Sequence, residues 1–204
     1  MSLGRTGFIG RFKPLHLGAA LALETLCQQS DHVIIGIGSS NKYNARSPFT
    51  AEESEDMINA VLAEYSNYEI VKIPDFAQEA KYSDGNKWKS YMIQEFGTLD
   101  HFVSGNTYVS DLLSTHYDVI HPASLIPPDE QIPIRATEVR IKMAQNTVWQ
   151  SLVPEIVVDY LENNNLVERF RNEFGLETLT HLINHPDYLT DESTLAEKLH
   201  TTET

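Results

Sequence analysis

One short stretch near the start of the chain, residues 7–19, restricts the possible folds more than any other feature. It opens with an apolar run that ends at Gly10, turns at Pro14 and becomes helix-like from Gly18 onward. Because a glycine has no Cβ atom, the backbone can pass close to another group at Gly10 and at Gly18. The pattern predicts a strand, a loop bounded by glycines and a helix in direct succession.

The loop between this strand and this helix has the chemistry of a phosphate site. The first amides of a helix have no internal partners, and the helix dipole adds positive potential there, so a helix start attracts phosphate. Arg11, Lys13 and His16 place further hydrogen-bond donors around the same point. The stretch therefore predicts a phosphate-binding pocket.

The rest of the chain alternates between apolar runs and helical patterns. Val33, Ile34 and Ile35 are apolar in succession, which is typical of a parallel strand covered on both faces. Thr50 and Glu53 have the spacing of a capping box at the start of a helix. The expected strands are residues 6–11, 32–38, 68–73, 101–104 and 118–121, and the expected helices are residues 18–29, 51–62, 86–96, 107–116, 137–144 and 154–162.

This alternation predicts an α/β fold. We expect a Rossmann-like open parallel sheet of about five strands, with helices on both faces and further helices at the C-terminus. The predicted domain covers residues 4–171, and residues 172–204 form a C-terminal extension that is expected to be helical or partly disordered.

The composition limits the partners that the chain can have. Of its 204 residues, 41% are hydrophobic and 22% charged, as in an ordinary soluble globule. A formal net charge of -14 argues against nucleic acid or an anionic membrane as a partner, because both repel an acidic surface. The single cysteine, Cys27, rules out an internal disulfide. With no targeting pattern and no apolar run of membrane length, a cytoplasmic location is expected.

Two further loops are expected to face the first one. Gly36-Ile37-Gly38-Ser39 ends the second strand, and Ser104-Gly105-Asn106 follows the fourth. A lone Gly-x-Gly turn is weak and has the plain interpretation of a tight strand exit. In open α/β sheets, however, loops beyond the carboxyl ends of neighbouring strands meet at one crevice. We expect these two loops and residues 10–18 to line it.

Other catalytic classes have no support in the sequence. His181 and His185 have i,i+4 spacing, but Leu182 stands where the metalloprotease motif has Glu, and no cysteine pair accompanies them. Neither a Gly-x-Ser-x-Gly elbow nor a Walker lysine motif is present. We expect no protein-bound metal ion, and neither a serine hydrolase nor a P-loop protein.

Residues 10–19, Gly-Arg-Phe-Lys-Pro-Leu-His-Leu-Gly-Ala, resemble the first signature of the nucleotidyltransferase superfamily, Gly-Arg-Phe-x-Pro-x-His-x-Gly-His. The likeness is to the archaeal-type nicotinamide-nucleotide adenylyltransferases in particular. Later motifs of that family occur in the same order, at residues 36–39, 46–50, 88, 104–106, 135–140 and 149–154. The resemblance thus covers most of the chain.

The resemblance implies that AMP is transferred from ATP to nicotinamide mononucleotide, giving NAD and pyrophosphate, with Mg²⁺ bridging the phosphate oxygens. It implies catalytic roles for His16, Arg46 and Arg140 and self-association into a homo-oligomer. The implied ATP and phosphate ligands are Gly10, Arg11, Phe12, Lys13, Gly18, Asn106, Arg135 and Thr137, and the implied nicotinamide-nucleotide ligands are Gly38, Ser39, Phe49 and Trp88. Trp88 would stack on the cationic pyridine ring.

Three departures from the family pattern stand out. Ala19 replaces the last His of the signature, and losing one such donor commonly costs on the order of 10²–10³ in rate. Arg135 stands where the family has Ser, and we expect that Arg135 or Lys13 partly substitutes for the absent imidazole. The family's Gly-Glu-Arg is Glu52-Glu53-Ser54 here, and nothing in the sequence explains that change.

Three interpretations therefore remain open. The chain is an adenylyltransferase that makes NAD, a catalytically silent relative that binds nucleotides, or an adenylyl- or cytidylyltransferase with another phosphorylated acceptor. Trp88 favours the nicotinamide acceptor, whereas Ala19 is compatible with a slow enzyme or with a silent relative that only binds nucleotides. Without the order of the motifs, His16 would be an ordinary turn residue, Arg140 a solvated helix charge and Trp88 a core side chain.

Overall fold

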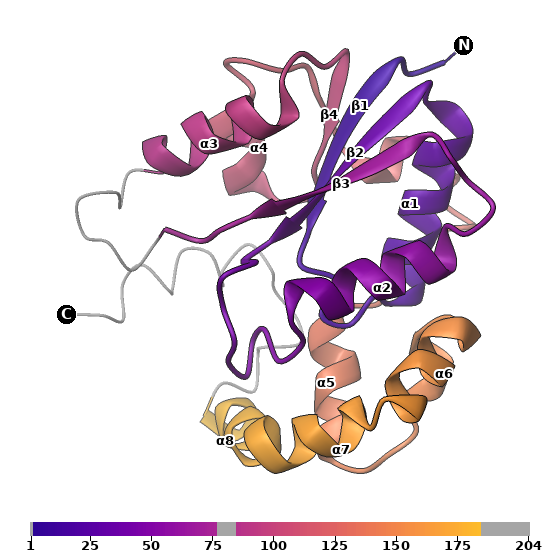
Figure 1. Cartoon of the computed structure of the whole chain (residues 1–204), viewed down its shortest axis with the longest axis vertical. Helices are drawn as coiled ribbons and strands as arrows, with labels where there is room; N and C mark the ends of the chain where they lie inside the picture. The colour runs from indigo at the N-terminus through magenta and orange to yellow at the C-terminus, as the bar shows by residue number, and fades with distance from the viewer. Residues whose placement is uncertain (1, 77–84, 185–204) are drawn as a thin grey trace.

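The structure is a computed structural model of the whole chain, and it describes residues 2–76 and 85–184. Five parallel strands form one sheet in the order β3-β2-β1-β4-β5, so the predicted α/β fold is confirmed (Figure 1). The strands are β1 (Arg5–Gly10), β2 (His32–Gly38), β3 (Tyr68–Ile73), β4 (His101–Val103) and β5 (Val119–Ile120). Each lies within one or two residues of its predicted position.

The helices and helical turns alternate with these strands and then continue to the end of the described chain. The helices are α1 (Leu17–Gln29), α2 (Ala51–Val61), α3 (Asn86–Phe96), α4 (Thr107–Leu113), α5 (Ala136–Ala144), α6 (Glu155–Asn163), α7 (Leu166–Phe170) and α8 (Leu176–Asn184). The short turns are the 3₁₀ helices η2 (Pro122–Ser124) and η3 (Gln150–Leu152) and the π-helical turn η4 (Arg171–Gly175).

The order of the strands places a switch point beside β1. The chain runs from β1 outward to β2 and β3, and then crosses back to place β4 and β5 on the other side. Gly7 of β1 consequently pairs with Ile34 on one side and with Phe102 on the other. The loops that leave β1 and β4 diverge from this point, which is where open α/β sheets bind ligands.

Helices cover both faces of the sheet, as the sequence predicts. Figure 1 shows α1 and α2 on one face, α3 and α4 on the other, and α5 to α8 gathered beyond the carboxyl ends of the strands. Val33 and Ile35 belong to the core on the α1 and α2 side, whereas Ile34 belongs to the core on the α3 side. The uninterrupted apolar run of β2 therefore reflects burial on alternate faces.

Local chemistry sets several of the helix ends. The capping box is confirmed, because Thr50 Oγ1 accepts from the Glu53 amide at 3.2 Å and Glu53 Oε2 accepts from the Thr50 amide at 2.8 Å. Asn165, at a φ of 54°, separates α6 from α7. Cys27 is buried, and that burial raises the pKa of its thiol to about 11, so it behaves as the expected small apolar residue.

Two predicted segments differ in detail from the structure. α4 ends at Leu113, three residues before its predicted end at 116, because Tyr117 turns into the core and donates its hydroxyl to the Gly97 carbonyl at 2.8 Å. The predicted loop at residues 122–133 begins with the turn η2, whose cap is His121 Nδ1. The predicted loop at 77–85 lies outside the described residues except for Gly85.

The C-terminal segment continues as helix well past residue 171. α7, η4 and α8 follow one another without a break, and α8 packs against α5. Arg171 also donates from Nε to the Met143 carbonyl of α5 at 2.8 Å. The first part of the predicted extension is therefore helical, residues 185–204 lie outside the described residues, and the division into domain and extension stays a prediction.

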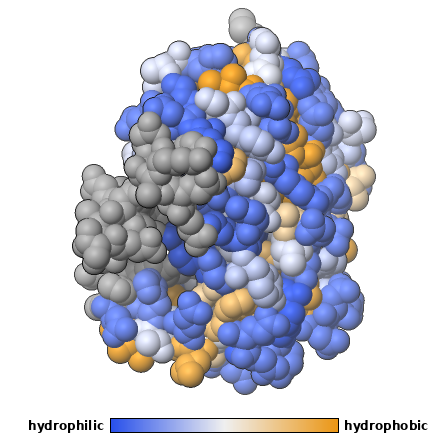
Figure 2. Space-filling model, turned by 60° about the vertical axis from the view of Figure 1, so that its left-hand side comes forward, coloured by the Kyte–Doolittle hydropathy of each residue, from blue (hydrophilic) through white to orange (hydrophobic). Residues whose placement is uncertain are grey.

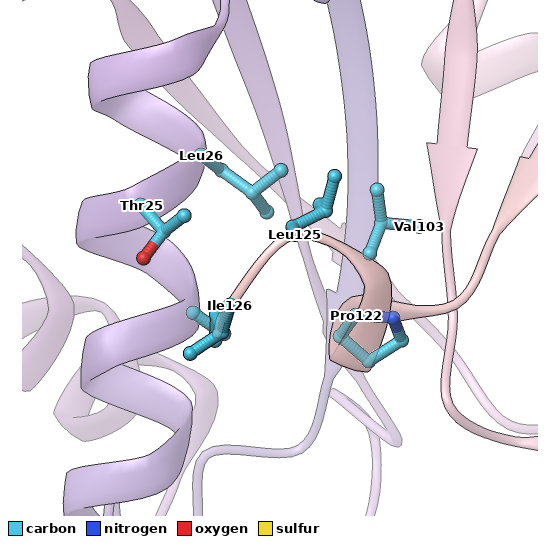
Figure 3. Close-up of a pocket in the computed structure, with 7 residues that line it drawn as sticks. Thr25, Leu26, Val103, Pro122, Leu125 and Ile126 are labelled. Atoms are coloured by element: carbon cyan, nitrogen blue, oxygen red, sulfur yellow. The ribbon is translucent and has the colours of Figure 1, made fainter. Parts of the chain in front are cut away.

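An apolar seam joins α1 to the segment that follows β5. Figure 3 shows Leu26 of α1, Val103 of β4 and Pro122, Leu125 and Ile126 converging on a space too narrow for a water molecule. This space is a packing contact and contains no predicted site residue. A second, shallow depression runs along α8 and likewise contains none of them.

Hydrophilic residues predominate on the face drawn in Figure 2, and apolar residues form small separate groups there. Among the residues that the structure describes, Val148, Leu176 and Ile183 are the most exposed large apolar residues, at 69%, 80% and 78%. Within the part of the chain that the structure describes, no helix combines the length and the apolarity that crossing a bilayer requires.

The central strand β2 predicts a clear steric effect. A Cβ atom added at Gly36 would lie 2.8 Å from Cζ of Phe96, and the surrounding core is closely packed. We expect Gly36→Ala to lower the free energy of unfolding by about 1–3 kcal/mol, measured by urea denaturation. The matched control is Gly175→Ala, because its nearest atom would be 3.9 Å away. Equal stability of the two variants would contradict the packing described for β2.

Candidate active site

The carboxyl ends of β1 and β2 bring two of the predicted loops into contact. Gly10 pairs with Ile37, and a Cβ atom on Gly38 would lie 3.7 Å from the Gly10 carbonyl oxygen. We call residues 11–16 the β1–α1 loop and residues 39–50 the β2–α2 loop. Both therefore begin side by side at the same edge of the sheet.

The two glycines of the first motif approach protein groups closely. A Cβ atom would lie 2.7 Å from the Phe12 ring at Gly10, and 2.3 Å from the Ile132 carbonyl oxygen at Gly18. Phe12 has a φ of 53° and is buried against Phe8. These positions therefore shape the β1–α1 loop, and their contact with a phosphate stays a prediction.

His16 caps the start of α1. Its Nδ1 atom accepts a hydrogen bond from the Ala19 amide at 3.3 Å. Burial and, to a smaller extent, the charge of Arg140 lower the pKa of His16 to about 4. At neutral pH the imidazole is therefore uncharged, and because Nδ1 is an acceptor its proton resides on Nε2. His16 can donate one hydrogen bond from Nε2 without first being protonated.

Arg140 reaches the β1–α1 loop from the second turn of α5. Its Nη1 atom donates to the Lys13 carbonyl at 2.8 Å, and its Nη2 atom donates to Thr137 Oγ1 at 3.1 Å. The side chain is only 3% exposed. The guanidinium also contributes, less than burial does, to the lowered pKa of His16. The first motif and α5 are therefore in contact, through Arg140 and the Lys13 carbonyl.

Lys13 has an unexpected environment. The sequence suggests a phosphate ligand, but the whole residue is inaccessible to solvent, and its Nζ atom donates to the Ser39 carbonyl at 3.1 Å. Burial and the neighbouring Arg11 lower the pKa of Lys13 to about 8. Arg11 itself is half-buried.

The β2–α2 loop contributes Arg46, the predicted catalytic arginine on that side. Its Nε atom is buried and has no hydrogen-bond partner among the residues that the structure describes. A buried donor without a partner is costly, and an anion would satisfy it. The Phe49 side chain is fully buried against Phe170, at 6.3 Å between ring centres. No part of Phe49 is therefore exposed here, and its contact with a nicotinamide nucleotide stays a prediction.

Sequence reasoning missed the residues that hold this loop from the C-terminal side. Arg169 of α7 forms a two-point ion pair with Glu53, with N–O distances of 2.5 and 2.7 Å, and donates to the Pro48 carbonyl at 3.1 Å. Its guanidinium also lies over the Tyr43 ring, whose hydroxyl donates to Glu173. No sequence motif marks Arg169, because its partner lies 116 residues earlier.

The remaining predicted residues lie on other elements around the sheet. Asn106 caps α4 at the carboxyl end of β4, where its Oδ1 atom accepts from the Val109 amide at 3.1 Å. Trp88 lies on α3 and is half-buried beside the α3 core. Arg135 occupies the cap position of α5 and is half-buried. Their roles toward a ligand stay predictions.

The donor set at this edge suits phosphate better than a protein-bound metal ion. Its predicted site residues include the cations Arg46, Arg140, Arg11 and Lys13, whereas the nearby Glu53 carboxylate is paired with Arg169. In the described part of the chain, no group of three or more His, Cys, Asp or Glu side chains could hold a metal.

The depressed pKa of His16 predicts a pH effect on stability. Between about pH 4 and pH 6.5 the unfolded chain binds a proton at His16 and the native protein does not, so stability rises with pH in this window. Relative to His16→Gln, the wild-type free energy of unfolding should fall by at most about 3 kcal/mol as the pH drops from 6.5 to 4. Denaturation at several pH values measures it. A constant difference between the two proteins would contradict the buried, neutral imidazole.

The strand order, the switch point and the donor-rich edge define a class of molecule: a Rossmann-like α/β protein that presents phosphate-seeking groups at the carboxyl ends of its strands. The model of the cytidylyltransferase-like family matches residues 8–142. The nicotinamide-nucleotide adenylyltransferase of Thermococcus kodakarensis is 32% identical over 170 residues, which cover 80% of this chain and 85% of that relative. That of Pyrococcus horikoshii is 33% identical, covering 81% and 86%.

Solved structures agree on the fold. A bifunctional NMN adenylyltransferase/ADP ribose pyrophosphatase from Francisella tularensis superposes with a TM-score of 0.60 at 21% identity, covering 83% of this chain. The present chain spans 56% of that protein's length. A complex of such a bifunctional protein with AMP and a manganese ion, also from Francisella tularensis, gives a TM-score of 0.60 at 19% identity, covering 93% of this chain and 57% of that one.

The chain therefore belongs to the cytidylyltransferase-like family, within the group of the archaeal-type nicotinamide-nucleotide adenylyltransferases.

Proposed function

We propose that this protein is a nicotinamide-nucleotide adenylyltransferase that transfers AMP from ATP to nicotinamide mononucleotide and releases pyrophosphate. The observation that carries the proposal is the hydrogen bond from Arg140 of α5 to the Lys13 carbonyl, which brings the late helix onto the β1–α1 loop that ends in His16. The names of the relatives give the transfer of an adenylyl group and the nicotinamide nucleotide that it concerns.

The reaction needs placement and charge stabilisation more than covalent help from the protein. An oxygen of the mononucleotide phosphate attacks the α-phosphorus of ATP, and the bond from that phosphorus to the bridging oxygen breaks. Pyrophosphate leaves with the electron pair. The proposed role of the protein is to hold the two phosphates in line and to place donors on the charge that develops.

Each predicted residue has a proposed part in this step. His16 donates from Nε2 to a phosphate oxygen, and its neutrality means that the donation persists across neutral pH. Arg140 supplies a fixed cation from α5. Arg46 supplies a second cation from the β2–α2 loop, where its buried Nε atom has no hydrogen-bond acceptor among the described residues. Trp88 stacks on the pyridine ring. The remaining proposed ligands are Gly10, Arg11, Phe12, Gly18, Gly38, Ser39, Phe49, Asn106, Arg135 and Thr137.

The proposal also includes a metal ion, partners, a location and an oligomeric state. Magnesium is the ion proposed to accompany ATP, bound to its phosphate oxygens. Small molecules are the proposed partners, and the net charge of -14 supports the view that nucleic acid is not one. A cytoplasmic location and a homo-oligomer complete the proposal.

A direct assay tests the function. Mixing the protein with ATP, Mg²⁺ and nicotinamide mononucleotide should release pyrophosphate and form NAD in equal amounts. Arg140→Lys should lower the rate by about 10²-fold or more, because lysine keeps the charge but loses the fork that bonds Lys13 and Thr137. Arg5→Lys is the control, since the side chain of Arg5 forms an exposed ion pair with Glu69. Rates that are equal in the two variants would remove Arg140 from the mechanism.

Ala19 is the observation that favours a second candidate, a silent relative that binds nucleotides without turnover. Its backbone amide bonds to His16, but its side chain provides no donor. Arg135 is the proposed substitute, because it stands at the start of α5, the helix that carries Arg140.

Two variants separate a compensated enzyme from a silent one. In a compensated enzyme, Arg135→Ser should lower the rate of pyrophosphate release by about tenfold or more, and Ala19→His should change it little. A silent protein should instead gain activity sharply with Ala19→His. An unchanged rate in Arg135→Ser would sink the idea that this arginine replaces the missing imidazole.

A further inference from the structure

Lys13 lies between the two loops that begin side by side at the sheet edge. We propose that Lys13 is a positioning residue that clamps the β2–α2 loop onto the β1–α1 loop, rather than a ligand of the phosphates. This inference rests on the proposed function only in that these loops are the ones assigned to the two substrates.

The ammonium group of Lys13 grips one tight turn of the β2–α2 loop. Nζ donates to the Ser39 carbonyl at 3.1 Å and, at a longer distance of 3.5 Å, to the Lys42 carbonyl. The Ser39 carbonyl also accepts from the Lys42 amide at 3.1 Å, which closes the turn. Lys13 therefore bonds to the carbonyls at both ends of the turn 39–42.

The backbone of Lys13 makes the second half of the clamp. Its carbonyl accepts from Arg140 Nη1 at 2.8 Å, so the same residue touches α5 through its main chain. Ser39 adopts a φ of 51°, a conformation that non-glycine residues seldom take without support. The contact with Nζ supplies such support. One residue thus connects the β1–α1 loop, the β2–α2 loop and α5.

Burial argues against direct phosphate contact. The exposed fraction of Lys13 is 0%, so a phosphate could reach the ammonium only after the surrounding loops had separated. Arg11 and Arg140 repel this charge and, together with burial, lower the pKa of Lys13, whereas Glu52 and Glu53 raise it. Burying the ammonium group costs desolvation free energy. Its hydrogen bonds to two carbonyls of another loop offset that cost.

A substitution that removes the ammonium would free the turn. In Lys13→Met the chain length is similar, but the Lys42 carbonyl loses the bond from Nζ and the Ser39 carbonyl keeps only its bond to the Lys42 amide. Since the loop carries Arg46 and Ser39, its loosening would affect both proposed substrates. A phosphate ligand would behave differently, because its loss affects the triphosphate most.

Two measurements on the full chain distinguish these cases. The first is hydrogen exchange of the ligand-free protein, where Lys13→Met should speed the exchange of the amides in residues 39–46 by about tenfold. The second is calorimetric titration with ATP and Mg²⁺ and, separately, with nicotinamide mononucleotide, where both dissociation constants should rise by similar factors. Lys72→Met is the matched control, because Lys72 forms exposed ion pairs with Glu52 and Glu55 on the surface, and its replacement should change neither quantity.

The opposite pattern overturns the proposal. If the loop amides of Lys13→Met exchange as in the wild type and only ATP binding weakens, Lys13 is a phosphate ligand. If the methionine variant does not fold, Lys13→Arg replaces it in both measurements, because arginine retains a positive charge and hydrogen-bond donors. Any loss of affinity in that variant should be shared by both ligands and accompany faster loop exchange. If the wild type binds neither nucleotide, the proposed function fails, and the exchange experiment still decides the role of Lys13.

Discussion

The hydrogen bond from Arg140 to the Lys13 carbonyl is the contact on which the arrangement of the site depends. It joins residues that are 127 positions apart and fixes the start of α5 against the first loop of the chain. A guanidinium that is almost fully buried must have its donors satisfied, because an unpaired buried charge is very costly. The Lys13 carbonyl and Thr137 Oγ1 satisfy two of them. The position of the guanidinium is therefore set by the fold before any ligand arrives.

Burial and the same guanidinium account for the protonation state of His16. Burial and the nearby guanidinium both disfavour a charged imidazole, so the ring stays neutral well below neutral pH. A neutral ring with its acceptor nitrogen bonded to the Ala19 amide has a fixed donor nitrogen. Positive charge at this edge accordingly resides in arginine and lysine side chains. The neutral imidazole instead offers a single hydrogen-bond donor in a fixed orientation.

Most of the fold can be predicted from local patterns. The apolar run of β2 gives the bounds of that strand, and the spacing of Thr50 and Glu53 gives the start of α2, because both depend on neighbouring residues. The glycine-bounded first motif also gives the start of α1 to within one residue. Such features depend on residues within a few positions of one another, so they can be predicted from the sequence alone.

What the sequence does not predict are contacts between distant positions. Lys13 looks like a surface cation beside a helix start, and only the folded chain reveals that its ammonium faces the Ser39 carbonyl. Arg169 likewise has no local signal, since its pair with Glu53 spans 116 residues. Motif order identified the loops that gather at the sheet edge. Which side chains support those loops depends on packing that no spacing rule encodes.

The central claim is that His16 and Arg140 grip one triphosphate between them, and a crystal structure with a non-hydrolysable ATP analogue tests it most directly. The account predicts phosphate oxygens within hydrogen-bond distance of both His16 Nε2 and the Arg140 guanidinium, at the carboxyl ends of β1 and β4. A triphosphate bound elsewhere on the sheet, or touching neither side chain, would contradict it.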